Sequence, residues 1–149
     1  DLDDETLSKL DIVTCSVHSH FNLSGEKQTE RFLKAMDNPN CHILGHLTGR
    51  LIGRREAYPV DVEKVLEKAV ETGTMIEINS QPDRLDLDDR YAKLAREKGV
   101  KIAITTDAHA TGHLRNITYG VHQARRGWLE ADDVANTRTW KQLQNLLRN

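Results

Sequence analysis

Short apolar runs and polar stops alternate along this chain at a spacing of about 30 residues. The four runs occupy residues 12–17, 41–45, 74–78 and 100–105. A repeat of this length suits one unit of strand, helix and two loops. The pattern therefore predicts an α/β protein in which parallel strands alternate with helices.

The segments between the runs repeat apolar residues at helical spacing. We expect a helix that begins after Ser24 and ends before Pro39, a second between Asp61 and Gly73, and a third that ends before Gly99. Serine and aspartate cap helix N-termini, and glycine commonly follows the last helical residue. Helical spacing also recurs after the fourth run, in segments at 114–124, 132–134 and 140–147.

Polar residues with metal-binding chemistry follow the apolar runs. They are His18, His46, Asn79, and the pair Asp107 and His109. Parallel strands bring their C-terminal ends to one edge of the sheet, where sites of this architecture are built. Imidazoles and a carboxylate gathered at that edge indicate a metal site.

Two parallel architectures fit this pattern, an open doubly wound sheet and a barrel. Doubly wound nucleotide-binding folds place a glycine-rich turn after their first strand, and residues 17–22 contain no such turn. A complete barrel needs about 250 residues and more strands than these four. We therefore expect parallel βα units that form part of a barrel.

The composition limits the class of protein further. The chain has 149 residues with 38% hydrophobic content, enough for one domain with its own core. A net charge of -2 and a pI near 6.4 argue against a histone-like nucleic-acid binder, although a local basic patch stays open. No apolar stretch approaches the roughly 20 residues that span a bilayer. We expect a soluble, cytoplasmic protein, and the absence of an initiator methionine suggests a piece of a longer chain.

The candidate ligands have alternative interpretations. Asp107 and His109 are two apart on an extended segment, so both side chains project to the same side. Alternatively, the aspartate caps the next helix and the histidine is solvated. His18 and His46 favour the metal site, because adjacent strands lie only about 4.8 Å apart.

Polar residues beside the ligands are candidates for substrate binding. Arg50, Arg54 and Arg55 follow His46, and their guanidinium groups suit a phosphate or the DNA backbone. A solvated loop is the alternative. Asn79 would orient a ligand or a water, or else make a local turn hydrogen bond.

Several motifs around these residues carry a family resemblance. They read CSVHSHFNLS at 15–24, GHLTGRLIGRR at 45–55, IEIN at 76–79, QPDRLDL at 81–87, TTDAH at 105–109 and YGVHQARRGWL at 119–129. From about Asp4 to its end the chain resembles the polymerase and histidinol phosphatase (PHP) domain. The similarity is to the version at the C-terminus of bacterial family X DNA polymerases.

The resemblance implies a distorted seven-stranded TIM-like barrel that holds up to three divalent metal ions. Residues 1–149 would form the C-terminal portion of that domain, because several upstream ligands of the family, including a metal-bridging glutamate, are missing here. By position, His18 and His46 would bind the metal shared with that glutamate, Asp107 the first ion and His109 the third. Mixed imidazole and carboxylate ligands favour zinc or manganese over magnesium. No catalytic residue is assigned beyond these ligands, and Leu47 departs from the proline common in related polymerases.

The resemblance also implies a function. It is that of a metal-dependent phosphoesterase module in a DNA repair polymerase of family X, acting as a 3′-5′ exonuclease or 3′-end phosphatase. DNA would then be a partner through the parent polymerase, and the isolated chain would have little or no activity. Two alternatives stay open, a non-catalytic half-barrel and a small-metabolite phosphatase of the histidinol phosphatase type. Open sheet edges in a half-barrel also predict self-association.

Overall fold

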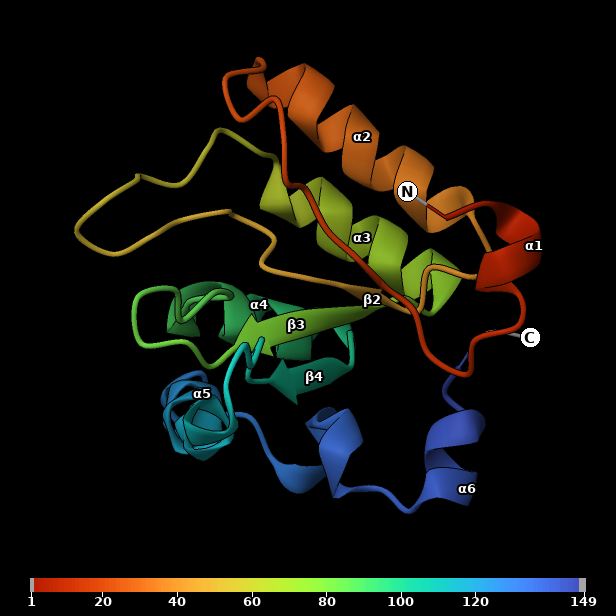
Figure 1. Ribbon diagram of the computed structural model, residues 1–149, viewed down its shortest axis with the longest axis vertical. Coiled ribbons are helices and arrows are strands. Elements are labelled where there is room, and N and C mark those ends of the chain that lie inside the picture. The colour runs from red at the N-terminus through yellow and green to blue at the C-terminus, as the bar shows by residue number, and fades with distance from the viewer. Residues whose placement is uncertain (1, 148–149) are drawn as a thin grey trace.

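The computed structural model describes residues 2–147 and contains one sheet of four parallel strands (Figure 1). The strands lie in chain order, so each βα unit adds the next strand to the same edge. They are β1 (Thr14–Cys15), β2 (Ile43–Leu44), β3 (Met75–Asn79) and β4 (Ile102–Thr105). The predicted α/β class and the parallel βα units are confirmed, and the described residues form a partial sheet.

The first two strands are shorter than their apolar runs. Only Thr14 and Cys15 form regular pairs with β2. Before this ladder, the carbonyl of Val13 accepts hydrogen bonds from the N–H groups of both His42 and Ile43, at 3.2 and 3.1 Å. One acceptor facing two donors breaks the parallel repeat, so the regular strand begins only at Thr14.

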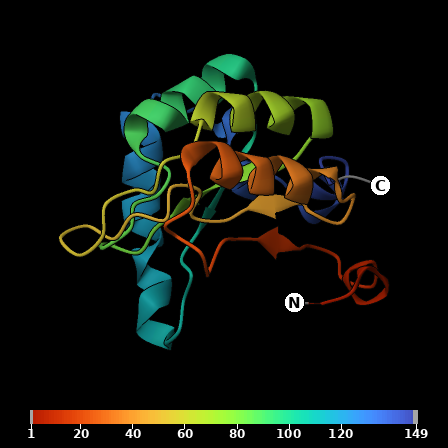
Figure 2. The ribbon, with the colours of Figure 1, turned by 90° about the horizontal axis from the view of Figure 1, so that it is seen from above.

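Three helices cover one face of the sheet (Figure 2). They are α2 (Gly25–Asp37), α3 (Val62–Thr72) and α4 (Asp89–Lys98). The predicted caps are confirmed, since the side chains of Ser24 and Asp61 accept hydrogen bonds from the first turns of α2 and α3. Gly73 and Gly99 end α3 and α4 in the left-handed conformation, with φ of 70° and 84°.

The C-terminal third is more irregular than its sequence pattern. Its elements are η1 (Thr111–Asn116), α5 (Ile117–Arg126), η2 (Ala131–Asp133), η3 (Ala135–Thr137) and α6 (Trp140–Gln144), and a short α1 (Asp4–Leu7) lies near the N-terminus. The predicted helix at 114–124 thus begins as a 3₁₀ turn and becomes α-helical at Ile117. Helix α5 packs against β3, β4 and α4. None of the helices in the described part of the chain has the length and apolarity that crossing a bilayer requires.

Both faces of the sheet are buried, which explains why the strands read as continuous apolar runs. Leu44 and Ile76 point to the core beneath the helices, while Ile43 and Met75 point to the opposite face. There they pack against Ala135 and the partly buried leucines at 143, 146 and 147. Figure 1 shows α6 on the side of the sheet away from α2 and α3.

The loops that follow β2 and β3 leave the sheet at the same end (Figures 1 and 2). Within the first loop, Leu51 forms an antiparallel bridge with Arg55, and the second loop returns to pair Asp86 with Asn79. The two loops are also joined to each other, because the N–H of Ile52 donates to the carbonyl of Asp83 at 2.6 Å. This end of the sheet is where the candidate residues were expected.

Candidate functional site

A tight turn after β2 positions His46. The residue has a positive φ of 31°, and its N–H donates to Glu77 Oε2 at 2.6 Å. The next N–H groups, of Thr48 and Gly49, donate to Asp86 Oδ2 at 3.0 and 2.9 Å. Two buried carboxylates therefore hold the backbone of the turn that carries His46.

His46 and His18 lie side by side at the ends of neighbouring strands. Their ring centroids are 5.2 Å apart, and His18 Nε2 lies 3.1 Å from Ser16 Oγ. His46 is 6% exposed, and its Nδ1 is buried without a hydrogen-bond partner among the described residues. Burial, followed by the charge of Arg84, lowers the pKa of His46 to about 4. The ring is therefore neutral at pH 7, as a metal ligand must be.

Asp107 lies near His46, at the end of β4. Its backbone has a φ of 47°, and its carboxylate forms an ion pair with Arg84, Oδ2 to Nε, at 3.6 Å. The charge of Asp107 acts on the pKa values of both His46 and Glu77: it opposes the larger lowering of the His46 pKa by burial, and it adds to the rise that burial causes in the Glu77 pKa.

His109 contacts Asp107 but is mostly exposed. Its side chain is 78% exposed, and its Nδ1 lies 2.7 Å from the carbonyl of Asp107 and 4.0 Å from its Oδ1. Its N–H donates to His113 Nδ1 at 3.3 Å. The structure therefore brings His18 and His46 into contact, and it places His109 against Asp107 after β4.

Glu77 is a site residue that the sequence analysis did not single out. It is 4% exposed in the middle of β3, where its carboxylate accepts from His46 N–H, from Thr105 Oγ1 at 2.5 Å and from Asn79 Nδ2 at 3.4 Å. Burial raises the pKa of this carboxyl. The sequence contained a signal for Glu77, because a carboxylate interrupts an apolar run there. It lies two residues before Asn79, so the two side chains point to the same face of the strand.

Asn79 makes the local hydrogen bond that was its alternative interpretation. It is fully buried, and its Oδ1 accepts from the N–H of Gln81 at 3.0 Å. The side chain thereby shapes the loop that follows β3, and its Nδ2 is turned to Glu77.

The three arginines of the first loop have different environments. Arg50 donates to the carbonyl of Arg84 at 2.7 Å and to that of Leu85. Arg55 donates to the carbonyl of Gly49 at 2.9 Å and stacks on the ring of Phe21. Two of the three guanidinium groups thus hold backbone, a role the sequence analysis did not consider. Arg54 is at the surface, with 73% of its side chain exposed.

The residues present fit part of a metal site. The buried, unpartnered Nδ1 of His46 and its neutral ring match what a divalent cation requires. Within residues 2–147, however, no three His, Cys, Asp or Glu side chains are spaced to hold an ion together. A metal site here would therefore need further ligands or a rearrangement of these side chains.

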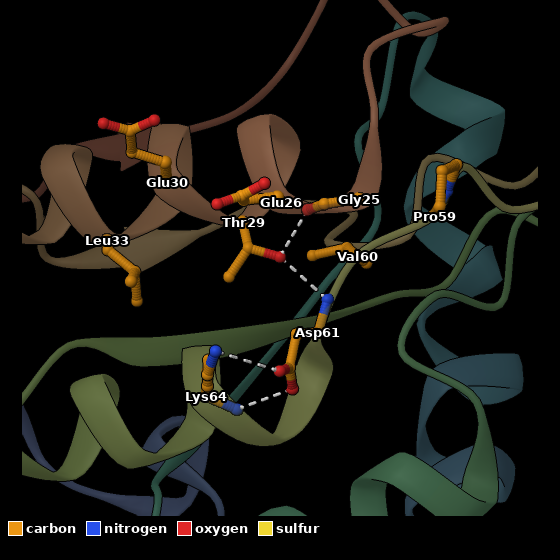
Figure 3. Close-up of a pocket in the computed structure, with 9 residues that line it drawn as sticks. All are labelled: Gly25, Glu26, Thr29, Glu30, Leu33, Pro59, Val60, Asp61 and Lys64. Carbon is orange, nitrogen blue, oxygen red and sulfur yellow. Dashed lines mark hydrogen bonds and ion pairs between the residues drawn. The ribbon is translucent and has the colours of Figure 1, made fainter.

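One cavity of the molecule lies between helices α2 and α3, away from the candidate residues, and a second reaches them only at His18. The first, of about 830 Å³, separates the first turns of α2 and α3 (Figure 3). Hydrogen bonds between residues that line this cavity join the two helices. Thr29 Oγ1 donates to the carbonyl of Gly25 and accepts from the N–H of Asp61. The second, of about 720 Å³, runs along β1 and is lined by His18, Cys15 and apolar residues. Cys15 and Cys41 form no disulfide among the described residues.

Comparison with known proteins relates the chain to two kinds of protein. It is 40% identical over 148 residues to the DNA polymerase/3′-5′ exonuclease PolX of Bacillus subtilis, covering 99% of this chain and 26% of that protein. It is 36% identical over 146 residues to a probable phosphatase of Thermoanaerobacter sp. (strain X514), covering 92% and 57% of the two chains. A probable phosphatase of Clostridium acetobutylicum is 34% identical over 124 residues, covering 78% of this chain and 48% of that protein. No family model matches the chain.

The chain thus spans about a quarter of the polymerase and about half of these phosphatases. Proteins of both kinds are homologues of this chain, and both names describe enzymes that break phosphoester bonds. The homology covers nearly the whole chain, so all the candidate residues lie within it.

Proposed function

We propose that this chain is part of a metal-dependent phosphoesterase with a PHP-type barrel, which acts on the 3′ ends of DNA within a family X polymerase. The observation that carries the proposal is the buried, unpartnered Nδ1 of a neutral His46 beside His18, at the strand ends of a chain related to an exonuclease. A nitrogen of this kind is costly to bury unless something binds it.

His18, His46 and Asp107 would hold the metal, with zinc or manganese favoured by this mixture of donors. His109 would join through the neighbouring loop. A bound divalent cation lowers the pKa of water and neutralises phosphate charge, which is the chemistry that phosphoester hydrolysis needs.

The protein's own residues prepare the site for that cation. Burial keeps His46 unprotonated at neutral pH, so no proton competes for its nitrogen. Glu77 orients the same histidine through its backbone N–H and adds negative charge behind it. Such support behind a ligand fixes its direction and strengthens metal binding.

The remaining ligands would come from other parts of a longer protein that completes the barrel along β1. This accounts for the incomplete ligand group in the described chain. On this proposal the chain of 149 residues hydrolyses DNA weakly or not at all, and a longer protein containing it is active.

A second candidate is a phosphatase of small metabolites. The similarity to probable phosphatases, of which the chain covers 57% in one case, favours it. The same ligands would serve, and only the substrate would differ.

The test measures bound metal and hydrolysis together. Purified protein, as the 149-residue chain and within a longer protein, is assayed with Mn²⁺ on a 3′-recessed DNA duplex and on small phosphate monoesters. We expect His18→Ala and Asp107→Asn to lower metal content and to reduce hydrolysis by the longer protein about 100-fold or more. His122→Ala, an exposed histidine on α5, is the matched control and should change neither. A longer protein that hydrolyses DNA equally well with and without His18 would contradict the proposal.

A further inference from the structure

We propose that Arg84 is the residue that binds the substrate's phosphate group, and that it takes the place of a cation beside Asp107 until a metal binds. This inference rests on the proposed function, because it names the part of the substrate that the same site recognises. Arg84 was noted in the sequence only as part of a motif, without a role.

The guanidinium of Arg84 is held inside the site with an unused donor. Its Nε lies 3.6 Å from Asp107 Oδ2, and only 20% of its side chain is exposed. Its NH1 is buried with no hydrogen-bond partner among the described residues. Burying a charged N–H group without an acceptor is unfavourable, so such a donor indicates a place for an anionic ligand.

The loop that carries Arg84 is fixed at its backbone. The N–H of Arg84 donates to the carbonyl of Gln81 at 2.8 Å, and the carbonyl of Arg84 accepts from Arg50 Nε at 2.7 Å. Arg50 also donates to Leu85, whose φ is 45°. A second arginine therefore holds the loop, which lowers the entropy lost when Arg84 engages a ligand.

Gln81 ties this loop to that of Asp107. Its Nε2 donates to the carbonyls of Thr106 and Asp107, the second at 3.2 Å, and Asn116 Nδ2 donates to its Oε1 at 3.0 Å. Arg84 and Asp107 therefore keep a fixed separation.

The charges around Arg84 suit a phosphate only when a cation is present. Asp107 neutralises the guanidinium, since its carboxylate forms an ion pair with Arg84. A divalent cation on Asp107 and the two histidines would reverse the local charge and free the guanidinium. Its planar fork of N–H groups matches two oxygens of a phosphate. Metal and Arg84 thus compete for Asp107, while metal and phosphate bind cooperatively.

Calorimetric titrations of the protein with Mn²⁺ and with inorganic phosphate test this inference without turnover. We expect Arg84→Ala to bind Mn²⁺ several-fold more tightly than the wild type when phosphate is absent, because a competing charge is gone. With Mn²⁺ saturating, the same variant should bind phosphate about 10-fold or more weakly. Arg84→Lys keeps the charge but not the fork, so its phosphate affinity should lie between the two.

Opposite changes in the two affinities separate this role from a structural one, which would weaken both. Arg125→Ala is the control, because that arginine is exposed on α5 and is not among the candidate site residues. If Arg84→Ala does not fold, the test is the comparison of phosphate affinity between Arg84→Lys and the wild type. Unchanged phosphate affinity in the Arg84 variants, or no phosphate binding by the wild type with Mn²⁺, overturns the inference. A wild type that binds phosphate through Arg84 but hydrolyses no phosphoester would instead overturn the proposed function.

Discussion

His46 and Asp86 are two buried ionisable groups at the turn after β2. Their pKa values shift in opposite directions. Burial, with the nearby charge of Arg84, lowers the pKa of His46 from 6.5 to about 4. Burial raises the pKa of Asp86 from 3.8 to about 6, even though Thr48 and Gly49 donate to it. Both groups therefore titrate over the same range of pH, but with opposite consequences for stability.

The direction of each effect follows from which state binds the proton first. Below pH 6.5 the unfolded chain protonates His46 before the folded protein does, so this residue lowers the free energy of unfolding as pH falls toward 4. The folded protein protonates Asp86 first, below about pH 6, so this residue raises the free energy of unfolding as pH falls. Each effect is on the order of 3 kcal/mol, and the two largely offset each other in the wild type.

Single substitutions should separate the two effects. In Asp86→Asn only the histidine remains, so the free energy of unfolding should fall by on the order of 3 kcal/mol between pH 6.5 and 4. In His46→Gln only the carboxyl remains, and the free energy of unfolding should rise over that range. Urea denaturation across these pH values measures both slopes. Parallel pH profiles for the wild type and the two variants would show that neither group is shifted.

For single residues, the sequence pattern identified the candidate side chains that directly follow strands. It did not identify side chains whose positions depend on tertiary contacts. The positions of His18 and His46 follow from strand ends that must lie side by side. Arg84 lies in a loop, and nothing in its residue type says that it points into the site. Nothing in the sequence indicates that Arg50 donates to the backbone carbonyls of Arg84 and Leu85.

Among the elements, the turn from His46 to Gly49 depends most on one residue. Gly49 has a φ of 63°, and a Cβ there would lie 2.0 Å from Tyr58 Cε1. Gly49→Ala should lower the free energy of unfolding by at least about 2 kcal/mol, because it adds both backbone strain and a clash with a buried ring. The displaced turn should also weaken metal binding through His46.

Gly53 provides the matched control in the same loop. Its φ is 75°, but a Cβ there would meet nothing within 4 Å. Gly53→Ala should therefore carry only the backbone strain, about 1 kcal/mol, and should leave metal binding unchanged. Chemical denaturation and metal titration of both variants make the comparison. Equal losses at the two glycines would mean that contact with Tyr58 is unimportant.

Helices were predicted more closely than strands, for a physical reason. Caps and stops such as Ser24 and Gly73 act within the helix itself, so their signals are local. The length of β1 depends instead on its partner, where two N–H groups converge on the carbonyl of Val13. That arrangement involves residues about 30 apart in sequence and leaves no local pattern.

For the whole molecule, the two edges of the sheet differ, although a half-barrel was expected to leave both open. At β4, Asn136 Oδ1 accepts from the N–H of Ile104 at 2.7 Å, and its Nδ2 donates to the carbonyl of Ile104 at 2.9 Å. This side chain covers the β4 edge as a strand would. The β1 edge has no such cover among the described residues, and Leu10 and Ile12 beside it are 45% and 37% exposed.

Self-association should therefore occur through β1. Sedimentation velocity should show a dimer that forms with rising concentration of the 149-residue chain, and Ile12→Lys should shift it toward monomer by placing a charge on the edge. Val70→Lys, at a 50% exposed position on α3, is the control and should leave the dimer unchanged. A wild type that stays monomeric at high concentration would contradict this expectation.

The position of Arg50 has a consequence for how such proteins diverge. Its guanidinium holds the backbone of Arg84 and Leu85 and approaches Asp88, 3.8 Å from its carboxylate, without belonging to the ligand group. A substitution there would loosen the loop that carries Arg84 while His18, His46 and Asp107 stay unchanged. If Arg84 binds phosphate as proposed, relatives that hydrolyse the same bond could acquire different substrate affinities through this supporting position.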